Sequence, residues 1–277
     1  MQFEKWQALG NDYVIVEGER LPWHLTAERV RRICDRHFGV GSDGVLLLSR
    51  PKSEQHVAEL RIFNPDGSEA ELSGNGAREA VLYLRRAGWT DADTFSLLTA
   101  AGEVRPTITS PDSVSMALGR ASLVSDDYPG GPEDGTGTLS SGGRDWRFRH
   151  VNVGNPQCVI EAGDEVEELD LVQIGPAIET SELFPNRTNV SFIAVDGSAV
   201  RARIFERGVG ETLSSGTGAS GAAVAAHLGG AASPITVRLD GGELTVEVSE
   251  DLELTLTGAA SPVYAGEMSP ELLRSLE

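Results

Sequence analysis

A chain of 277 residues is long enough for one large or two mid-sized domains with buried cores. Its formal net charge of -19 argues against nucleic acid and anionic membranes as partners, because both attract basic surfaces. The N-terminal stretch MQFEKWQALG has no apolar run suited to a signal peptide or a membrane span, which predicts a cytoplasmic protein.

The elements read along the chain predict a sheet-rich α+β protein. Thr26 is placed to cap a helix that buries Val30, Ile33 and Cys34 and ends near Gly39. A second helix is predicted over 169–178, and two more follow glycine-rich turns, one ending before Gly88 and one over 219–228. The last of these is apolar almost all round, which indicates a helix buried inside a sheet. Apolar runs between turn residues predict strands at 12–17, 44–49, 58–63, 113–118, 157–162, 189–195, 235–239 and 252–258. The segment 128–143, rich in Gly, Pro, Asp and Ser, is expected to be an exposed loop.

Residue counts argue against metal and cofactor chemistry. The five histidines are scattered, and Cys34 and Cys158 form no metal or disulfide pattern. The two lysines, Lys5 and Lys52, lie in no site-like setting, which disfavours a pyridoxal phosphate enzyme. The glycine-rich turns complete neither phosphate-loop pattern. We therefore expect no cofactor and no metal.

The chain contains an internal repeat. Residues 61–77 read RIFNPDGSEAELSGNGA, and residues 203–219, which lie 142 positions later, read RIFERGVGETLSSGTGA. A second pair, GNDYVIV from Gly10 and GNPQCVI from Gly154, keeps nearly the same spacing. Two copies of one half-domain would offer one ligand two equivalent hydroxyls, Ser73 and Ser215, from opposite sides. That arrangement suits chemistry with an acid on one face and a base on the other.

Each of these serines directly precedes a predicted helix. The first backbone N–H groups of a helix lack partners and carry a partial positive charge, so the turns are suited to binding a carboxylate. Several asparagine amides, one acidic side chain and one basic side chain lie near these turns in the sequence, a set suited to a zwitterionic amino acid. For any single Asn, an ordinary turn role remains open. The candidate catalytic residues are Ser73 and Ser215, and the candidate substrate-binding residues are Asn11, Asn64, Gly74, Asn75, Asn155, Asn189, Glu206, Arg207, Gly216 and Thr217.

Six segments, in order, resemble the diaminopimelate epimerase family: LGNDYVIVE, FGVGSDGVLLL, RIFNPDGSEAELSGNGAR, VNVGNPQCVI, FPNRTNVSF and ERGVGETLSSGTGA. The resemblance implies two pseudosymmetric domains, 1–117 plus 262–277 and 118–261, each a mostly antiparallel sheet wrapped around a central helix. It also implies a homodimer that inverts one stereocentre of LL-2,6-diaminopimelate without a cofactor, giving the meso form used for lysine and peptidoglycan. The matching Asn64, Asn155, Asn189, Glu206 and Arg207 would hold the substrate's amino and carboxylate groups.

Two family positions differ in a way that bears on catalysis. In family members, cysteines at the positions of Ser73 and Ser215 act as base and acid, whereas this chain has serine at both. A thiol of pKa ~8.5 can be lowered by about 1.5 units by a helix N-terminus worth ~2 kcal/mol. A serine hydroxyl starts several units higher and stays protonated in the same field. As written, the chain is therefore expected to epimerise poorly or not at all.

Three explanations remain open from the sequence. The chain is an epimerase changed from Cys to Ser at both positions, a native Ser/Ser homologue that acts like a hydroxyproline dehydratase, or a non-catalytic protein that binds amino acids. Gly44 and Gln157 also differ from the residues that many relatives have, Gln and His, so the usual roles at these positions are not carried over.

Overall fold

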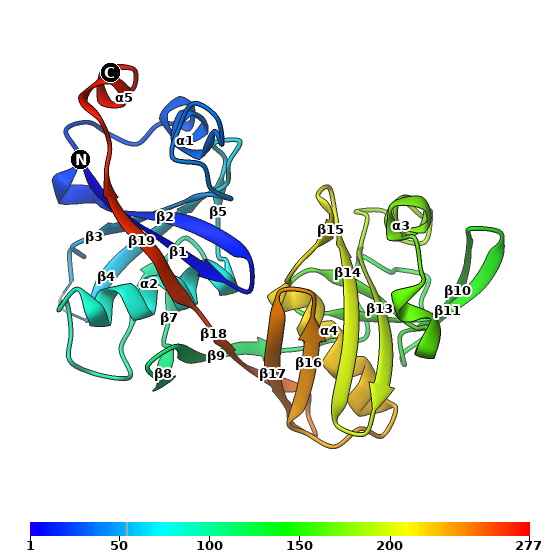
Figure 1. Ribbon diagram of the computed structural model, residues 1–277. Coiled ribbons are helices and arrows are strands. Elements are labelled where there is room, and N and C mark those ends of the chain that lie inside the picture. The colour runs from blue at the N-terminus through cyan, green and yellow to red at the C-terminus, as the bar shows by residue number, and fades with distance from the viewer. Residues whose placement is uncertain (54) are drawn as a thin grey trace. The chain divides into compact units, whose positions relative to one another are not determined.

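The computed structural model describes residues 1–53 and 55–277 (Figure 1). The chain divides into two compact units: unit 1 comprises residues 1–116 and 258–277, and unit 2 comprises residues 117–257. It passes from one unit to the other within two strands, β9 (Ser113–Arg120) and β18 (Glu253–Ala259). Mixed sheets with few helices confirm the predicted α+β class.

Unit 1 is built on a mixed sheet in the order β19-β1-β2-β3-β4-β6-β7, with β5 paired to β4. Strands β2 and β3 are parallel, as are β4 and β6. Helix α2 contacts β1, β2, β3, β4 and β19, and one apolar core joins the helix to the sheet. The elements of this unit are β1 (Gln2–Ala8), β2 (Asn11–Glu17), η1 (Gly18–Arg20), α1 (Ala27–Cys34), β3 (Val45–Ser49), β4 (Ala58–Phe63), β5 (Glu69–Ala70), α2 (Gly74–Arg86), β6 (Leu97–Thr99), β7 (Gly102–Val104), β8 (Thr107–Ser110), β19 (Ser261–Glu267) and α5 (Pro270–Arg274).

Unit 2 repeats this plan. Its strands follow the order β10-β11-β12-β13-β14-β16-β17-β18-β9, with β15 paired to β14, and the pairs β12/β13 and β14/β16 are parallel. Helix α4 contacts β11 to β14, β16 and β17, so the sheet surrounds it as predicted. The elements are β10 (Thr136–Ser141), β11 (Arg144–Asn152), β12 (Pro156–Glu161), η2 (Gly163–Glu167), α3 (Leu171–Glu179), β13 (Asn189–Asp196), β14 (Ala199–Glu206), β15 (Gly210–Thr212), α4 (Gly216–Leu228), β16 (Ile235–Leu239) and β17 (Gly242–Val248).

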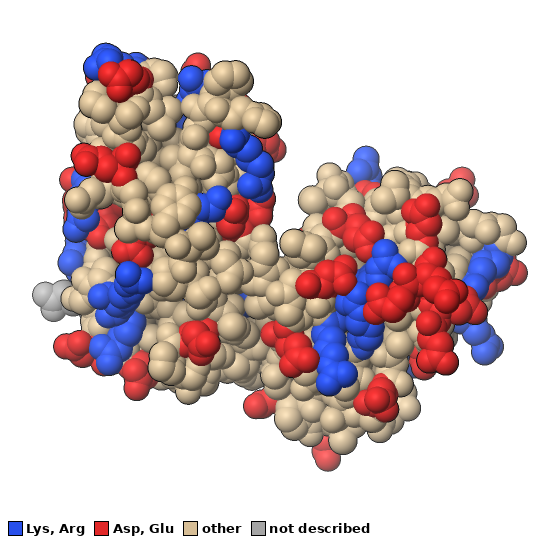
Figure 2. Space-filling model, in the orientation of Figure 1, with Lys and Arg blue, Asp and Glu red and all other residues tan. Residues whose placement is uncertain are grey.

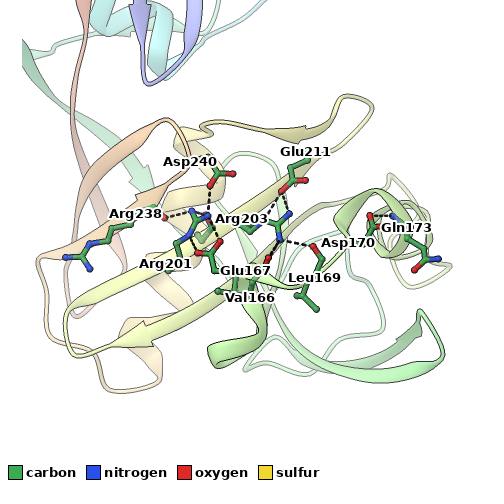
Figure 3. A network of polar contacts seen from close by, with 11 residues as sticks. Val166, Glu167, Leu169, Asp170, Gln173, Arg201, Arg203, Glu211, Arg238 and Asp240 are labelled. Carbon is green, nitrogen blue, oxygen red and sulfur yellow. Dashed lines mark hydrogen bonds and ion pairs between the residues drawn. The ribbon is translucent and has the colours of Figure 1, made fainter.

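The repeated sequence forms the same local structure in both units. Cross-strand pairing places Phe63 opposite Glu69 in unit 1 and Phe205 opposite Glu211 in unit 2. The shared Arg and Glu then form equivalent ion pairs, Arg61–Glu69 at 2.7 Å and Arg203–Glu211 at 2.7 Å. Figure 3 shows the second pair, in which Arg203 also donates to backbone carbonyls before α3. The repeated Arg and Glu thus hold the short strand that leads into each key helix.

Two expectations about local structure were wrong. Helix α1, capped by Thr26 as predicted, ends at Cys34 rather than near Gly39, because the Asp35 carboxylate accepts the N–H groups of the next turn. The segment 128–143 is not simply an exposed loop. Its residues 136–141 form strand β10, and Tyr128 is buried against the rings of Phe148 and Phe184, whose apolar contact outweighs the local turn composition.

Acidic side chains are spread over the visible face in Figure 2 and interleave with the Lys and Arg side chains. Many of these charges are paired, as in the Arg201–Glu167 contact. No helix within residues 1–53 and 55–277 is long and apolar enough to cross a membrane.

Candidate active site

Ser73 lies at the start of α2 and is its N-cap. Its Oγ accepts a hydrogen bond from the Gly76 N–H at 3.1 Å. The Tyr13 hydroxyl on β2 donates a second hydrogen bond to the same oxygen at 3.3 Å. Ser73 is therefore held by one donor from its own helix and one from the neighbouring strand.

A directed chain of side chains continues from this helix start. The Asn75 Nδ2 donates to Asn11 Oδ1 at 3.1 Å, and the Asn11 Nδ2 donates to Asp43 Oδ2 at 3.1 Å. Beneath them, Arg78 donates to Asn75 Oδ1 at 2.6 Å and to the Gly74 carbonyl at 3.2 Å. Each acceptor fixes which way the next amide faces, so the two predicted asparagines have one defined orientation.

Asn64 occupies a turn position. Its Nδ2 donates to Ser68 Oγ at 2.9 Å, and its N–H donates to the Ser68 carbonyl at 2.8 Å. The side chain thus stabilises the turn between β4 and β5, which lies just ahead of the segment that carries Ser73.

Unit 2 has the corresponding helix start at Ser215, the N-cap of α4. Its Oγ accepts from the Gly218 N–H at 3.2 Å. Glu206, at the end of β14, accepts from the Thr212 hydroxyl at 2.8 Å. Burial raises the pKa of the Glu206 carboxyl, and hydrogen bonds from the Thr212 and Ser215 hydroxyls act in the opposite direction. The second serine therefore lies beside a desolvated carboxyl group.

The amide pairing of unit 1 has a counterpart here. Asn155 Nδ2 donates to the Thr217 hydroxyl at 3.3 Å, as Asn75 and Asn11 pair in unit 1. Gln157 is fully buried and donates to Asn155 Oδ1 at 2.6 Å. These side-chain hydrogen bonds therefore connect the first turn of α4 to the segment around the start of β12.

Asn189 and Arg207 are linked through the backbone. The Arg207 N–H donates to Asn189 Oδ1 at 2.8 Å, and Asn189 Nδ2 donates to the Pro156 carbonyl at 3.1 Å. The Arg207 guanidinium, on an exposed residue, donates to the Asn186 carbonyl at 2.8 Å. Asn189 thereby orders the turn that carries Glu206 and Arg207.

Each unit thus presents a capped helix start, with Gly74 or Gly216 as first helical residue, beside a pair of hydrogen-bonded polar side chains. The model of the diaminopimelate epimerase family matches residues 3–124 and 149–263. A protein of Nostoc sp. named diaminopimelate epimerase 2 is 40% identical over 278 residues, covering 98% of this chain and 97% of the relative. The diaminopimelate epimerase of Moorella thermoacetica is 38% identical over 282 residues, covering 96% and 99%.

The chain belongs to the diaminopimelate epimerase family. The family is one of isomerases. Solved structures share the fold at low identity. A Bacillus anthracis phenazine biosynthesis protein of the PhzF family has a TM-score of 0.70 at 19% identity, covering 97% of this chain and 99% of that one. A hydroxyproline epimerase from Agrobacterium vitis has a TM-score of 0.66 at 18% identity, covering 96% and 91%.

In this diaminopimelate epimerase family member, the residues Gly44 and Gln157, which differ from those of many relatives, have structural explanations. A Cβ added at Gly44 would lie 2.6 Å from the Tyr13 ring and 2.3 Å from the Phe63 carbonyl oxygen, so a side chain there would displace the ring. Gln157 packs against Gly221 of α4, where an added Cβ would lie 2.9 Å from it. Gly44 therefore leaves room for Tyr13, and Gly221 leaves room for Gln157.

Sequence reasoning did not single out four residues of this family member: Tyr13, Asp43, Arg78 and Glu79. Arg78 and Glu79 are fully buried on α2, which is unusual for charged side chains. The sequence signal for this burial is their position within a helix predicted to lie at the centre of a sheet. Burial lowers the pKa of Arg78 to about 10, which leaves it charged at neutral pH. Burial raises the pKa of Glu79, while the neighbouring Arg78 cation and a hydrogen bond from the Tyr13 backbone act in the opposite direction. Among the described residues, no three or more His, Cys, Asp or Glu side chains cluster as metal ligands.

We expect Glu79→Gln to remove a pH-dependent loss of stability. A carboxyl whose pKa is raised on folding favours the folded state while it is protonated, so the parent chain loses stability as pH rises above the ordinary value of 4.5. Between pH 4 and pH 8, the free energy of unfolding measured in urea should therefore increase for the variant relative to the parent as pH rises. The exposed Glu71→Gln is the matched control and should follow the parent. A parallel pH profile for Glu79→Gln would contradict the expectation.

Proposed function

We propose that this chain has the framework of an enzyme that converts LL-2,6-diaminopimelate to meso-diaminopimelate without a cofactor, in lysine and peptidoglycan biosynthesis. We further propose that Ser73 and Ser215 make it a double Cys-to-Ser variant with little or no activity. The observation that carries the proposal is the repeated site: in both units, a serine caps a buried helix beside a pair of polar side chains.

The reaction needs two groups. Inversion removes the α-proton from one face of the carbon and returns a proton to the other face, so one group accepts and the other donates. Position 73 and position 215 each supply one such group in the proposed enzyme. With hydroxyls in place of thiols, the accepting group is not ionised near neutral pH, and the proton stays on carbon.

The remaining polar residues would bind the substrate. The N–H groups at the starts of α2 and α4, around Gly74, Asn75, Gly216 and Thr217, suit a carboxylate. By family resemblance, the amino and carboxylate groups also engage Asn64, Asn155, Asn189, Glu206 and Arg207. Asn11 adds a further neutral amide to this set. The raised pKa of Glu206 fits a group that shares a proton with a substrate amine, since its charge is poorly solvated.

The chain as written should bind diaminopimelate without racemising it. Titration calorimetry should detect binding, and the α-proton should not exchange in deuterated water, because the binding groups remain while the ionisable thiols are absent. Proline and hydroxyproline, which lack the distal carboxylate, should bind much more weakly. Absence of binding at millimolar ligand would contradict the proposal. Tighter binding and dehydration of trans-3-hydroxyproline would instead establish the dehydratase alternative.

We also propose a cytoplasmic homodimer. Strand β19 is the edge of the sheet in unit 1, and it exposes Val263 and Tyr264 with 53% and 45% of their surface accessible. An edge strand with exposed apolar side chains favours pairing with a second copy.

A further inference from the structure

We propose that Tyr13 is a positioning residue for the group at position 73, and that its hydroxyl selectively stabilises an anion there. The inference deepens the proposed function, because it rests on position 73 being one of the two proton-transfer groups. Its basis is a contact between residues 60 positions apart, the 3.3 Å hydrogen bond from the Tyr13 hydroxyl to Ser73 Oγ.

The ring of Tyr13 is held in place on several sides. Tyr13 is only 5% exposed and belongs to the same core as the apolar residues of α2. The missing side chain at Gly44 provides the space that the ring occupies. Its backbone is fixed by the antiparallel pairing with Trp6. The phenol is therefore preorganised to donate to position 73 instead of being recruited by a ligand.

The corresponding position in unit 2 behaves differently. Gln157 takes the place of Tyr13 in the repeat, 144 positions along, but its amide donates to Asn155 and not to Ser215. Ser215 receives the Gly218 N–H and lies beside the Glu206 carboxyl. Two donors thus face position 73, whereas a donor and a carboxyl group face position 215. Two donors stabilise an anion, and a neighbouring carboxylate opposes one.

The other charged groups near the start of α2 are the same in every variant compared at position 73. Arg78 donates to the Gly74 carbonyl, and Glu79 lies next to it on the helix. Asp12 and Asp43 interact with Glu79 electrostatically, and they are paired with Lys5 and Arg36, respectively. A change confined to the Tyr13 hydroxyl leaves all of these groups in place, so it isolates the contribution of the phenol.

The test is the acidity of a thiol placed at position 73. In the full chain with Ser73→Cys, the pH dependence of alkylation by iodoacetamide gives the thiol pKa. Cys34 and Cys158 are buried, with pKa values raised by that burial, so they react slowly, and the parent chain measures their background. Adding Tyr13→Phe, which keeps the ring, should raise the thiol pKa by about one unit. The thiol of a Ser215→Cys chain should titrate higher than that at position 73.

The matched control is Tyr83→Phe in the same Ser73→Cys chain. Tyr83 is buried in the same core, but its hydroxyl donates to Glu17 at 2.7 Å. Its loss should leave the thiol pKa unchanged. An unchanged pKa in Tyr13→Phe, or an equal shift in Tyr83→Phe, would overturn the assignment. If Tyr13→Phe failed to fold, 3-fluorotyrosine at position 13 would replace it in the test. This residue is a stronger hydrogen-bond donor and should lower the thiol pKa, so an unchanged thiol pKa would also overturn the assignment.

Turnover separates this inference from the proposed function. In the chain with Ser73→Cys and Ser215→Cys, adding Tyr13→Phe should lower kcat roughly tenfold at neutral pH with a smaller change in KM, because less thiolate is present. A shifted thiol pKa in a chain with no turnover would support the role of Tyr13 and refute the epimerase proposal. Turnover that Tyr13→Phe leaves unchanged would refute the role of Tyr13 alone.

Discussion

The chain carrying Ser73→Cys and Ser215→Cys together should convert LL-diaminopimelate to meso-diaminopimelate with no added cofactor. A thiol at a helix N-terminus ionises near neutral pH, whereas a serine hydroxyl does not, so the double change restores both the accepting and the donating group. We expect an increase of at least about three orders of magnitude over the parent chain, in line with the combined worth of two acid–base groups. Chiral chromatography of the two isomers measures it.

Each single change is the control for the double change. One thiol supplies only half of the proton relay, so either single variant should invert the substrate very slowly. A single variant can still exchange the α-proton with solvent or eliminate a leaving group from a halogenated analogue, and this partial reaction would show which face each unit serves. A folded double variant that binds diaminopimelate but remains inert would mean that the serines belong to a different function.

Replacing Arg78 by Met should destabilise unit 1 by about 3–5 kcal/mol, the cost of removing one member of a buried polar network. Arg78 is fully buried, and it holds both the Gly74 carbonyl and the Asn75 amide at the start of α2. Its loss removes both of these hydrogen bonds and leaves Glu79 without the nearby cation that lowers its pKa. Urea unfolding followed by circular dichroism measures the change.

The control for Arg78→Met is Arg86→Met. Arg86 lies at the exposed end of the same helix, so its replacement should change the free energy of unfolding by only about 0.5 kcal/mol. Diaminopimelate binding should also weaken in Arg78→Met, because the orientation of Asn75 and Asn11 depends on the guanidinium. Equal stability of the two variants would contradict this account of α2.

The repeat and the helix starts were predictable from the sequence, because both depend on local patterns. Ser73 and Ser215 precede glycine-rich turns and helical periodicity, and both serve as N-caps. The apolar runs likewise located the central strands β2, β3, β4, β12 and β13, but not the arginine-containing β14. The short edge strands β5, β7 and β15 and the charge-rich β11 were not predicted, because they lack a sustained apolar run. Strand β11 buries Trp146 and Phe148 between arginines.

Only the tertiary structure distinguished the two halves of the site. By sequence, Ser73 and Ser215 occupy equivalent turns, but the neighbours that differ, Tyr13 and Glu206, come from strands whose register decides what they contact. The way in which the sheet closes over α2 decides two further features. Tyr13 fills the space left by Gly44, and the charged Arg78 and Glu79 are buried. Local periodicity determines which face of an element is apolar, whereas contacts between distant residues are determined by strand pairing and packing, which no short segment encodes.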